Sequence, residues 1–127
     1  MKCPVCQKSM VILEFHSVEM DFCPSCEGCW LDRGELGLII SGTPDLPDEF
    51  KLAGERKSER RCPRCERRMR AGLLPATQVE VDVCDRQHGL WLDKGELQAI
   101  VRDRGAEKSA AAVAEFVMGV FGTKKNE

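Results

Sequence analysis

The chain has 127 residues, a formal net charge of -2 and eight cysteines. Its longest apolar stretch, between Val113 and Phe121, is interrupted by Glu115, so it is far shorter than the roughly 20 residues that a membrane-spanning helix needs. Because the first cysteine is residue 3, we expect no secretory leader before it, a cytoplasmic protein and no membrane partner.

Three short phrases each occur twice, in the same order and with similar spacing. They are Cys3-Pro-Val-Cys6 and Cys62-Pro-Arg-Cys65, Val18-Glu-Met-Asp-Phe-Cys23 and Val79-Glu-Val-Asp-Val-Cys84, and Trp30-Leu-Asp-Arg-Gly-Glu-Leu36 and Trp91-Leu-Asp-Lys-Gly-Glu-Leu97. The repetition predicts two units of one design, each of roughly 40 residues, a size at which an apolar core alone rarely stabilises a fold. We divide the chain into a first unit over 1–42, a charged linker over 43–60, a second unit over 61–105, and a C-terminal amphipathic helix and tail over 106–127.

The first unit begins with a predicted hairpin. Apolar and acidic residues alternate from Val18 to Phe22, which indicates a strand buried on one face, and we expect its partner strand over Met10–Phe15. Asp32 and Glu35 follow, and their spacing is typical of a helix start in which each carboxylate accepts a hydrogen bond from an exposed amide. The same carboxylates could form an acid/base pair, but capping explains them more economically.

Four cysteines of this unit form two Cys-x2-Cys pairs that are separated by 16 residues. This spacing lies within the range of structural zinc sites, in which four thiolates saturate a tetrahedral ion. A disulfide framework is the alternative, but a reducing cytosol favours metal binding. A hairpin brings the two pairs together, so we predict one zinc ion here. The predicted ligands are Cys3, Cys6, Cys23 and Cys26.

Several residues of the first unit lie outside this ligand set. Cys29 corresponds to Leu90 in the second unit, so we interpret it as a small buried hydrophobe, with a substitute ligand or a redox-sensing thiol as the alternative. Trp30 and Trp91 either cover the metal sites and seat the helices or lie at an interface, and the small size of the units favours the first role. His16 has no ligand spacing and is interpreted as a surface residue.

The linker and the start of the second unit are basic. Between Arg56 and Arg70 there are eight basic side chains and two acidic ones, a pattern typical either of a surface that binds a polyanion or of a solvated linker. One helical turn is expected near Asp48 to Ala53. The candidate polyanion-binding residues are Arg60, Arg61, Arg64, Arg67, Arg68 and Arg70.

The second unit repeats the hairpin, over Met69–Leu74 and Val79–Val83, with a connection two residues longer. Gln87 stands where the first unit has Cys26, but His88 lies next to it. The longer imidazole side chain can compensate for one extra residue of spacing, so we predict a Cys3His zinc site. The alternative is that His88 is a surface histidine and the site is incomplete. The predicted ligands are Cys62, Cys65, Cys84 and His88.

A separate helix is predicted after Gly105. Its apolar positions need a surface to cover, which is the rest of the chain, another copy of the chain, or a partner. These positions are Val113, Phe116, Val117, Val120 and Phe121.

The combination of Cys-Pro-x-Cys, a hairpin, a second cysteine cluster and Gly-x-Trp-Leu-Asp-x-Gly-Glu-Leu resembles the transcription factor IIB-type zinc-finger domain family, a group of small prokaryotic zinc-ribbon-like modules. The resemblance covers residues 2–40 and 61–101. It implies that the two predicted ligand sets bind zinc, two ions per chain, with the replacement of the fourth cysteine in the second copy as the one departure. The family implies a fold more firmly than a role.

These observations predict a small metal-bound α+β fold with two tandem zinc-ribbon-like modules, each a β-hairpin with zinc knuckles plus a short helix, and a C-terminal helix. We expect a non-enzymatic, zinc-binding adaptor that contacts a protein partner or self-associates through the C-terminal helix, with a role in transcription. A nucleic-acid-binding zinc ribbon that uses the basic segment is the second hypothesis, and a thiol redox or metal-handling protein is the third. No small-molecule substrate is expected.

Overall fold

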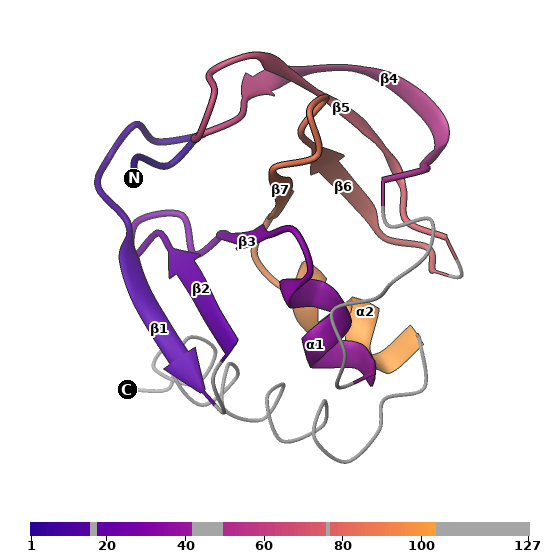
Figure 1. Ribbon diagram of the computed structural model, residues 1–127, viewed down its shortest axis with the longest axis horizontal. Helices are drawn as coiled ribbons and strands as arrows, with labels where there is room; N and C mark the ends of the chain where they lie inside the picture. The colour runs from indigo at the N-terminus through magenta and orange to yellow at the C-terminus, as the bar shows by residue number, and fades with distance from the viewer. Residues whose placement is uncertain (16–17, 42–49, 76, 104–127) are drawn as a thin grey trace.

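The computed structural model describes residues 1–15, 18–41, 50–75 and 77–103. In this part of the chain, seven antiparallel strands form one sheet in the order β1-β2-β3-β7-β6-β5-β4 (Figure 1). Neither described helix has the length and apolar content of a membrane span. The elements are β1 (Val11–Phe15), β2 (Val18–Phe22), β3 (Cys29–Asp32), α1 (Glu35–Ser41), β4 (Ala53–Arg61), β5 (Arg68–Leu73), β6 (Glu80–Val83), β7 (Gly89–Leu92) and α2 (Glu96–Asp103).

The two predicted hairpins are confirmed. Strands β1 and β2 form the first, and β5 and β6 form the second, with matching registers: Ile12 lies opposite Asp21, as Ala71 lies opposite Asp82. The apolar residues of β2 and β6 are buried, as the alternation predicts for a strand with one face in a core. A longer connection separates the second pair of strands, because β5 ends at Leu73 and β6 begins only at Glu80.

The two hairpins are joined through β3 and β7, which contain the Trp-Leu start of each Trp phrase. These strands pair with each other in antiparallel register, so that Trp30 lies opposite Trp91 and Leu31 opposite Leu90. An antiparallel pair of equivalent strands relates the two halves by an approximate twofold axis. The tandem units are therefore the two halves of one continuous sheet.

Both helices contribute to one shared apolar core. Leu36 and Ile39 from α1 belong to the same buried cluster as Leu97 and Ile100 from α2, together with Leu31 and other side chains of the central strands. Each helix begins directly after the Gly of the Trp phrase, and Gly95 has a positive φ of 84°, a conformation that glycine adopts without steric cost. A single core explains how units of this size fold together.

The charged segment between the units differs from its prediction. The linker predicted over 43–60 is wrong from Ala53 onward, because Ala53–Arg61 forms β4 and pairs with β5. The helical turn expected near Asp48 to Ala53 is also wrong where it can be compared, since residues 50–52 are not helical. Residues 42–49, His16 and the predicted helix over 106–127 lie outside the described residues.

Candidate metal centres

The structure brings all eight predicted ligands together in two groups of four. The first comprises Cys3, Cys6, Cys23 and Cys26, and the second Cys62, Cys65, Cys84 and His88; within each, the candidate ligand atoms lie within 4.8 Å of one another. The Sγ atoms of Cys3 and Cys26 are 3.7 Å apart, as are those of Cys65 and Cys84. Four thiolates around a tetrahedral zinc ion, each about 2.3 Å from it, are about 3.8 Å apart. The sulfur positions therefore match that geometry.

The four turns that carry the ligands share one backbone frame. In each turn the N–H of the first cysteine donates to the carbonyl oxygen five residues later: Cys3 to Lys8, Cys23 to Gly28, Cys62 to Arg67 and Cys84 to Gly89, at 2.8 to 3.0 Å. Backbone N–H groups inside the turns point at the sulfurs, and the amide nitrogens of Val5 and Cys6 lie 3.3 and 3.2 Å from Cys3 Sγ. Such donors stabilise negative charge on a ligand sulfur.

The fourth turn reaches its ligand by a shift of one residue. In the first three turns the residue after the second cysteine has a positive φ: Gln7, Glu27 and Glu66. In the fourth turn Gln87, at the position of Cys26, has the positive φ of 61° instead. Correspondingly, the N–H of Glu27 bonds to the carbonyl of Cys23 four residues earlier, whereas that of Gln87 bonds to Cys84 only three residues earlier.

This shift places the next residue, His88, at the metal site. Its Nδ1 lies 3.4 Å from Cys84 Sγ and 4.0 Å from Cys62 Sγ. A nitrogen and a sulfur ligand of one tetrahedral zinc ion are expected about 3.6 Å apart, which lies between these two distances. The spacing predicts that the longer imidazole side chain compensates for the extra residue. The structure adds a tighter turn, which turns the side chain inward.

The protonation behaviour of the thiols also fits a bound cation. Burial raises the pKa of Cys26 and of Cys62 to about 12. Burial acts in the same direction on Cys23, but N–H donors from Cys26 and Ser25 outweigh it and lower the pKa of Cys23 to about 7. Several thiolates cannot share such a small volume at neutral pH without a positive charge, and a metal ion supplies that charge. The residues present therefore fit zinc.

The two tryptophans cover these sites from opposite halves. Both indole rings are fully buried, in one cluster with Cys3, Cys23, Cys62 and other ligand cysteines. A Cβ atom added to Gly28 would lie 2.4 Å from Cζ2 of Trp91, and one added to Gly89 would lie 2.7 Å from Cζ2 of Trp30. Each tryptophan thus packs on the glycine of the other half. Sequence reasoning missed this role, although a glycine two residues before each tryptophan was a visible signal.

The carboxylates after the tryptophans hold local structure. The indole nitrogens of Trp30 and Trp91 donate to Asp32 and Asp93, at 2.9 and 3.0 Å. The backbone N–H of each of these aspartates in turn donates to the glutamate three residues later, at 2.8 Å in the first half and 2.7 Å in the second. The glutamate half of the predicted capping pattern is confirmed, and the aspartate side chains hold the indole rings.

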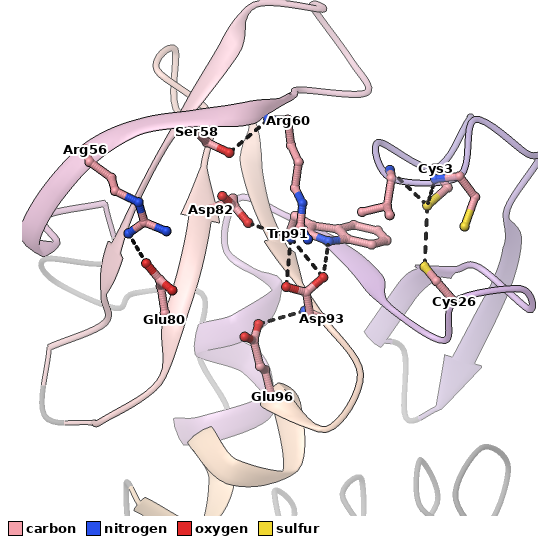
Figure 2. A network of polar contacts seen from close by, with 12 residues as sticks. Cys3, Cys26, Arg56, Ser58, Arg60, Glu80, Asp82, Trp91, Asp93 and Glu96 are labelled. Atoms are coloured by element: carbon pink, nitrogen blue, oxygen red, sulfur yellow. Dashed lines mark hydrogen bonds and ion pairs between the residues drawn. The ribbon is translucent and has the colours of Figure 1, made fainter.

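The arginines of the basic segment are largely engaged within the chain. Arg64 forms two bonds across the halves to Asp32, at 2.5 and 2.8 Å. Arg60 contacts Asp93 at 2.7 Å and Asp82 at 3.1 Å, as Figure 2 shows. Arg61 donates to the carbonyl of Glu66 at 3.0 Å. The remaining candidates also have acidic neighbours: Arg67 lies near Asp85, Arg68 near Glu59, and Arg70 near Glu55 and Asp85.

Cys29 lies away from both ligand sets. It is a free thiol that is buried in the main apolar core, and burial raises its pKa to about 12. A protonated, inaccessible thiol packs as a small hydrophobe and is a poor nucleophile.

One family model matches this chain, that of the transcription factor zinc-finger, and it does so twice, over residues 2–42 and 61–103. Searches of curated proteins and of solved structures found no match. The two matched segments contain both ligand groups, both Trp-Leu-Asp phrases and both helices. The chain belongs to the transcription factor zinc-finger family, with two copies of the family's metal-binding unit in one sheet.

Proposed function

We propose that this chain is a non-enzymatic cytoplasmic scaffold in which two zinc ions stabilise a surface that binds a protein partner, in the context of transcription. The observation that carries the proposal is that four side chains of metal-ligand type converge at each of the two candidate sites. Zinc in such a site is coordinatively saturated, and its contribution is to cross-link the chain. The metal ions then serve only to hold the fold, and the exposed surface is left to act. This arrangement is usual in zinc-containing binding modules.

The arrangement of side chains supports this reading over a catalytic one. Glu35 and Glu96 accept hydrogen bonds from backbone amides, so the carboxylate pairs have a capping role. A polar cleft of about 530 Å³ lies between β4, β6 and the start of α2, and its arginines Arg56 and Arg60 are already bonded to Glu80, Asp82 and Asp93. Charges that neutralise one another within the chain leave little to polarise a substrate.

Cobalt substitution tests the metal part of this proposal. Co²⁺ in place of zinc reports coordination through its visible spectrum, and we expect tetrahedral bands of a four-sulfur site and a three-sulfur, one-nitrogen site. Addition of azide should leave both spectra unchanged, because no coordination position is open. A spectral change on adding azide would show an exchangeable position and contradict a purely structural role.

Photo-crosslinking in the cell tests the partner part. A photoreactive amino acid in place of exposed residues of the zinc-loaded chain should give adducts to protein. Adducts to nucleic acid alone would contradict the proposal.

Nucleic-acid binding is the second candidate, favoured by exposed basic side chains on β4 and β5 such as Lys57, Arg61 and Arg68. The ion pairs described above weaken the positive potential of this surface, which is why we place it second. Binding to mixed DNA and RNA at low salt, lost steeply as salt rises, would support it. No retention at low salt would exclude it.

A further inference from the structure

Each tryptophan connects the two metal sites directly. Trp30 lies four residues after the last cysteine ligand of the first site, and it packs on Gly89, which directly follows the ligand His88 of the second site. In the other half, Trp91 lies three residues after His88 and packs on Gly28, two residues after the last ligand of the first site. The segment that follows the fourth ligand of each site therefore covers the ligand turn of the other.

Two polar contacts join the same turns across the halves. The backbone N–H of Arg33 donates to the carbonyl oxygen of the ligand His88 at 2.9 Å. The ammonium group of Lys94 lies 3.4 Å from the carboxylate of Glu27, which directly follows the last cysteine ligand of the first site. Each half therefore also contacts the ligand turn of the other half through groups outside the tryptophans.

A further link starts inside a ligand turn of the second site. Arg64 lies between the ligands Cys62 and Cys65, and its guanidinium forms two bonds to Asp32 in the first half, at 2.5 and 2.8 Å. Asp32 accepts the indole hydrogen of Trp30 at 2.9 Å. A guanidinium and a carboxylate that are bonded at two points have a defined relative orientation. The position of this ligand turn therefore fixes the Asp32–Trp30 pair.

At the equivalent position the first half has a side chain that cannot form this link. Val5 stands where the second half has Arg64, and an aliphatic side chain cannot bond to Asp93, the equivalent of Asp32. Asp93 is instead bonded by Arg60 from its own half (Figure 2). Arg64 thus ties the second site to the first half without a symmetric counterpart, which makes it a residue at which the connection can be tested.

These contacts link the binding of one metal ion to the binding of the other. A bound ion joins four ligands from two turns and fixes those turns relative to each other. The segments that follow these ligands are then held in place against the other site, whose turns lose conformational freedom before their own ion binds. The second ion therefore binds with a higher apparent affinity than it would have alone. Reciprocity requires that each ion raise the affinity of the other by the same factor.

We propose that the two metal sites bind zinc cooperatively, and that Arg64 is the positioning residue that couples the ligand turn of the second site to the Asp32–Trp30 pair of the first half. Chains with one ion are then scarce, and the folded sheet forms over a narrow range of free zinc concentration. The exposed surface of the sheet is therefore assembled in a switch-like response to zinc. The inference rests on the metal part of the proposed function and is independent of the partner.

Counting the ions on single chains tests the cooperativity. The reduced full-length chain is equilibrated with a zinc-buffering chelator until it carries one ion on average, and native mass spectrometry measures the species with zero, one and two ions. Two independent sites, whatever their affinities, leave at least half of the chains with one ion. Coupling of about tenfold between sites of similar affinity should reduce this fraction to about a quarter. A one-ion fraction of half or more would overturn the inference.

Cobalt binding isolates the part played by Arg64, because the four-sulfur site has visible bands of its own. We expect Arg64→Gln to weaken Co²⁺ binding at that site at least about threefold, and Cys84→Ala, which disables the second site, to weaken it about tenfold or more. In the Cys84→Ala background, Arg64→Gln should have no further effect. The matched control is Arg67→Gln: Arg67 pairs with Asp85 within the second half at 3.6 Å, so the affinity of the four-sulfur site should be unchanged.

The coupling role of Arg64 is contradicted if Arg64→Gln leaves the affinity of the four-sulfur site unchanged, if Arg67→Gln weakens it equally, or if Arg64→Gln acts as strongly in the Cys84→Ala background. Retention of two ions by Arg64→Gln at excess zinc, measured by mass spectrometry, shows that this variant is folded. Failure of either site to bind zinc or cobalt would instead contradict the proposed function. Two ions that bind independently would leave that function intact and remove only this inference.

Discussion

The turn from Cys23 to Gly28 and the turn from Cys84 to Gly89 hold equivalent metal sites with different ligands. Their outer hydrogen bonds are the same, since each first cysteine donates to the carbonyl five residues later at 3.0 Å. The residue with positive φ differs, and this decides whether position 26 or position 88 faces the metal. The hydrogen-bonded frame of the turn is therefore kept, and the position of the one residue with left-handed backbone selects the ligand.

The largest effect is expected from removing one ligand, Cys84→Ala. Structural zinc contributes about 10–16 kcal/mol in small zinc-finger peptides, and the two halves share one sheet and one core. We expect the variant to lose zinc from the second site and to destabilise both halves in a single transition. Calorimetry together with metal analysis measures this. The control is Cys29→Ala, a buried cysteine outside both sites, which should retain both ions. Independent unfolding of the first half at its wild-type temperature would contradict the shared core.

The next effect tests the crossed tryptophans. Gly28→Ala and Gly89→Ala each place a Cβ inside van der Waals contact with the tryptophan of the other half, and overpacking of this kind costs about 1–3 kcal/mol or more. The free energy of unfolding by denaturant measures the loss. Gly54→Ala is the comparison: its φ is positive, unlike those of Gly28 and Gly89, but no atom lies within 4 Å of an added Cβ, so any loss there reflects backbone strain without overpacking. Equal losses at all three glycines would refute tight packing across the halves.

A smaller effect concerns the pH dependence of stability. Burial raises the pKa of Glu96 to about 8, above its ordinary value near 4.5, so the folded state retains a proton that the unfolded state has released. The stabilisation linked to this proton decreases as pH rises through 8. Glu96→Gln keeps an oxygen acceptor for the Asp93 amide and removes the titration. We expect the melting temperature of the variant to fall less than that of the wild type between pH 6 and 9, and parallel curves would contradict this.

The smallest effect is expected from exchanging the ligand position itself. The double variant Gln87→Cys/His88→Glu gives the second half the Cys-x2-Cys-Glu pattern of the first half. If the frame is common to both turns, the positive φ moves to residue 88 and the chain still binds two zinc ions, with a melting temperature within a few degrees of the wild type. Metal analysis and the cobalt spectrum of a four-sulfur site check this. Loss of the second ion would show that the frame does not adapt.

Much of the fold and of the site follows from local sequence patterns. The alternation from Val18 to Phe22 predicts β2 because a period of two is visible within the five residues of the strand. The cysteine spacing predicts the first ligand set because a hairpin returns the chain to its starting point. The sequence indicates His88 as a ligand because it lies next to Gln87, which replaces the fourth cysteine. The shift in the turn that places His88 at the site depends on the φ of Gln87, and the spacing of the residues does not reveal that angle.

The rest depends on contacts between distant segments. Strand β4 is mostly charged, with little apolar alternation, and it pairs with β5 through arginines whose partners lie on other strands. Strand β7 is buried at every position, so it has no period to recognise, and its pairing with β3 connects residues about 60 positions apart. The packing of each tryptophan on a glycine of the other half follows from that pairing.

The most direct test of two zinc-held halves is native mass spectrometry of the purified chain, with its thiols counted after denaturation. We expect two zinc ions per chain and eight free thiols, and on chelation a charge-state distribution typical of an unfolded chain. A folded chain that carries no zinc, or one in which the cysteines of either set are joined as disulfides, would contradict it.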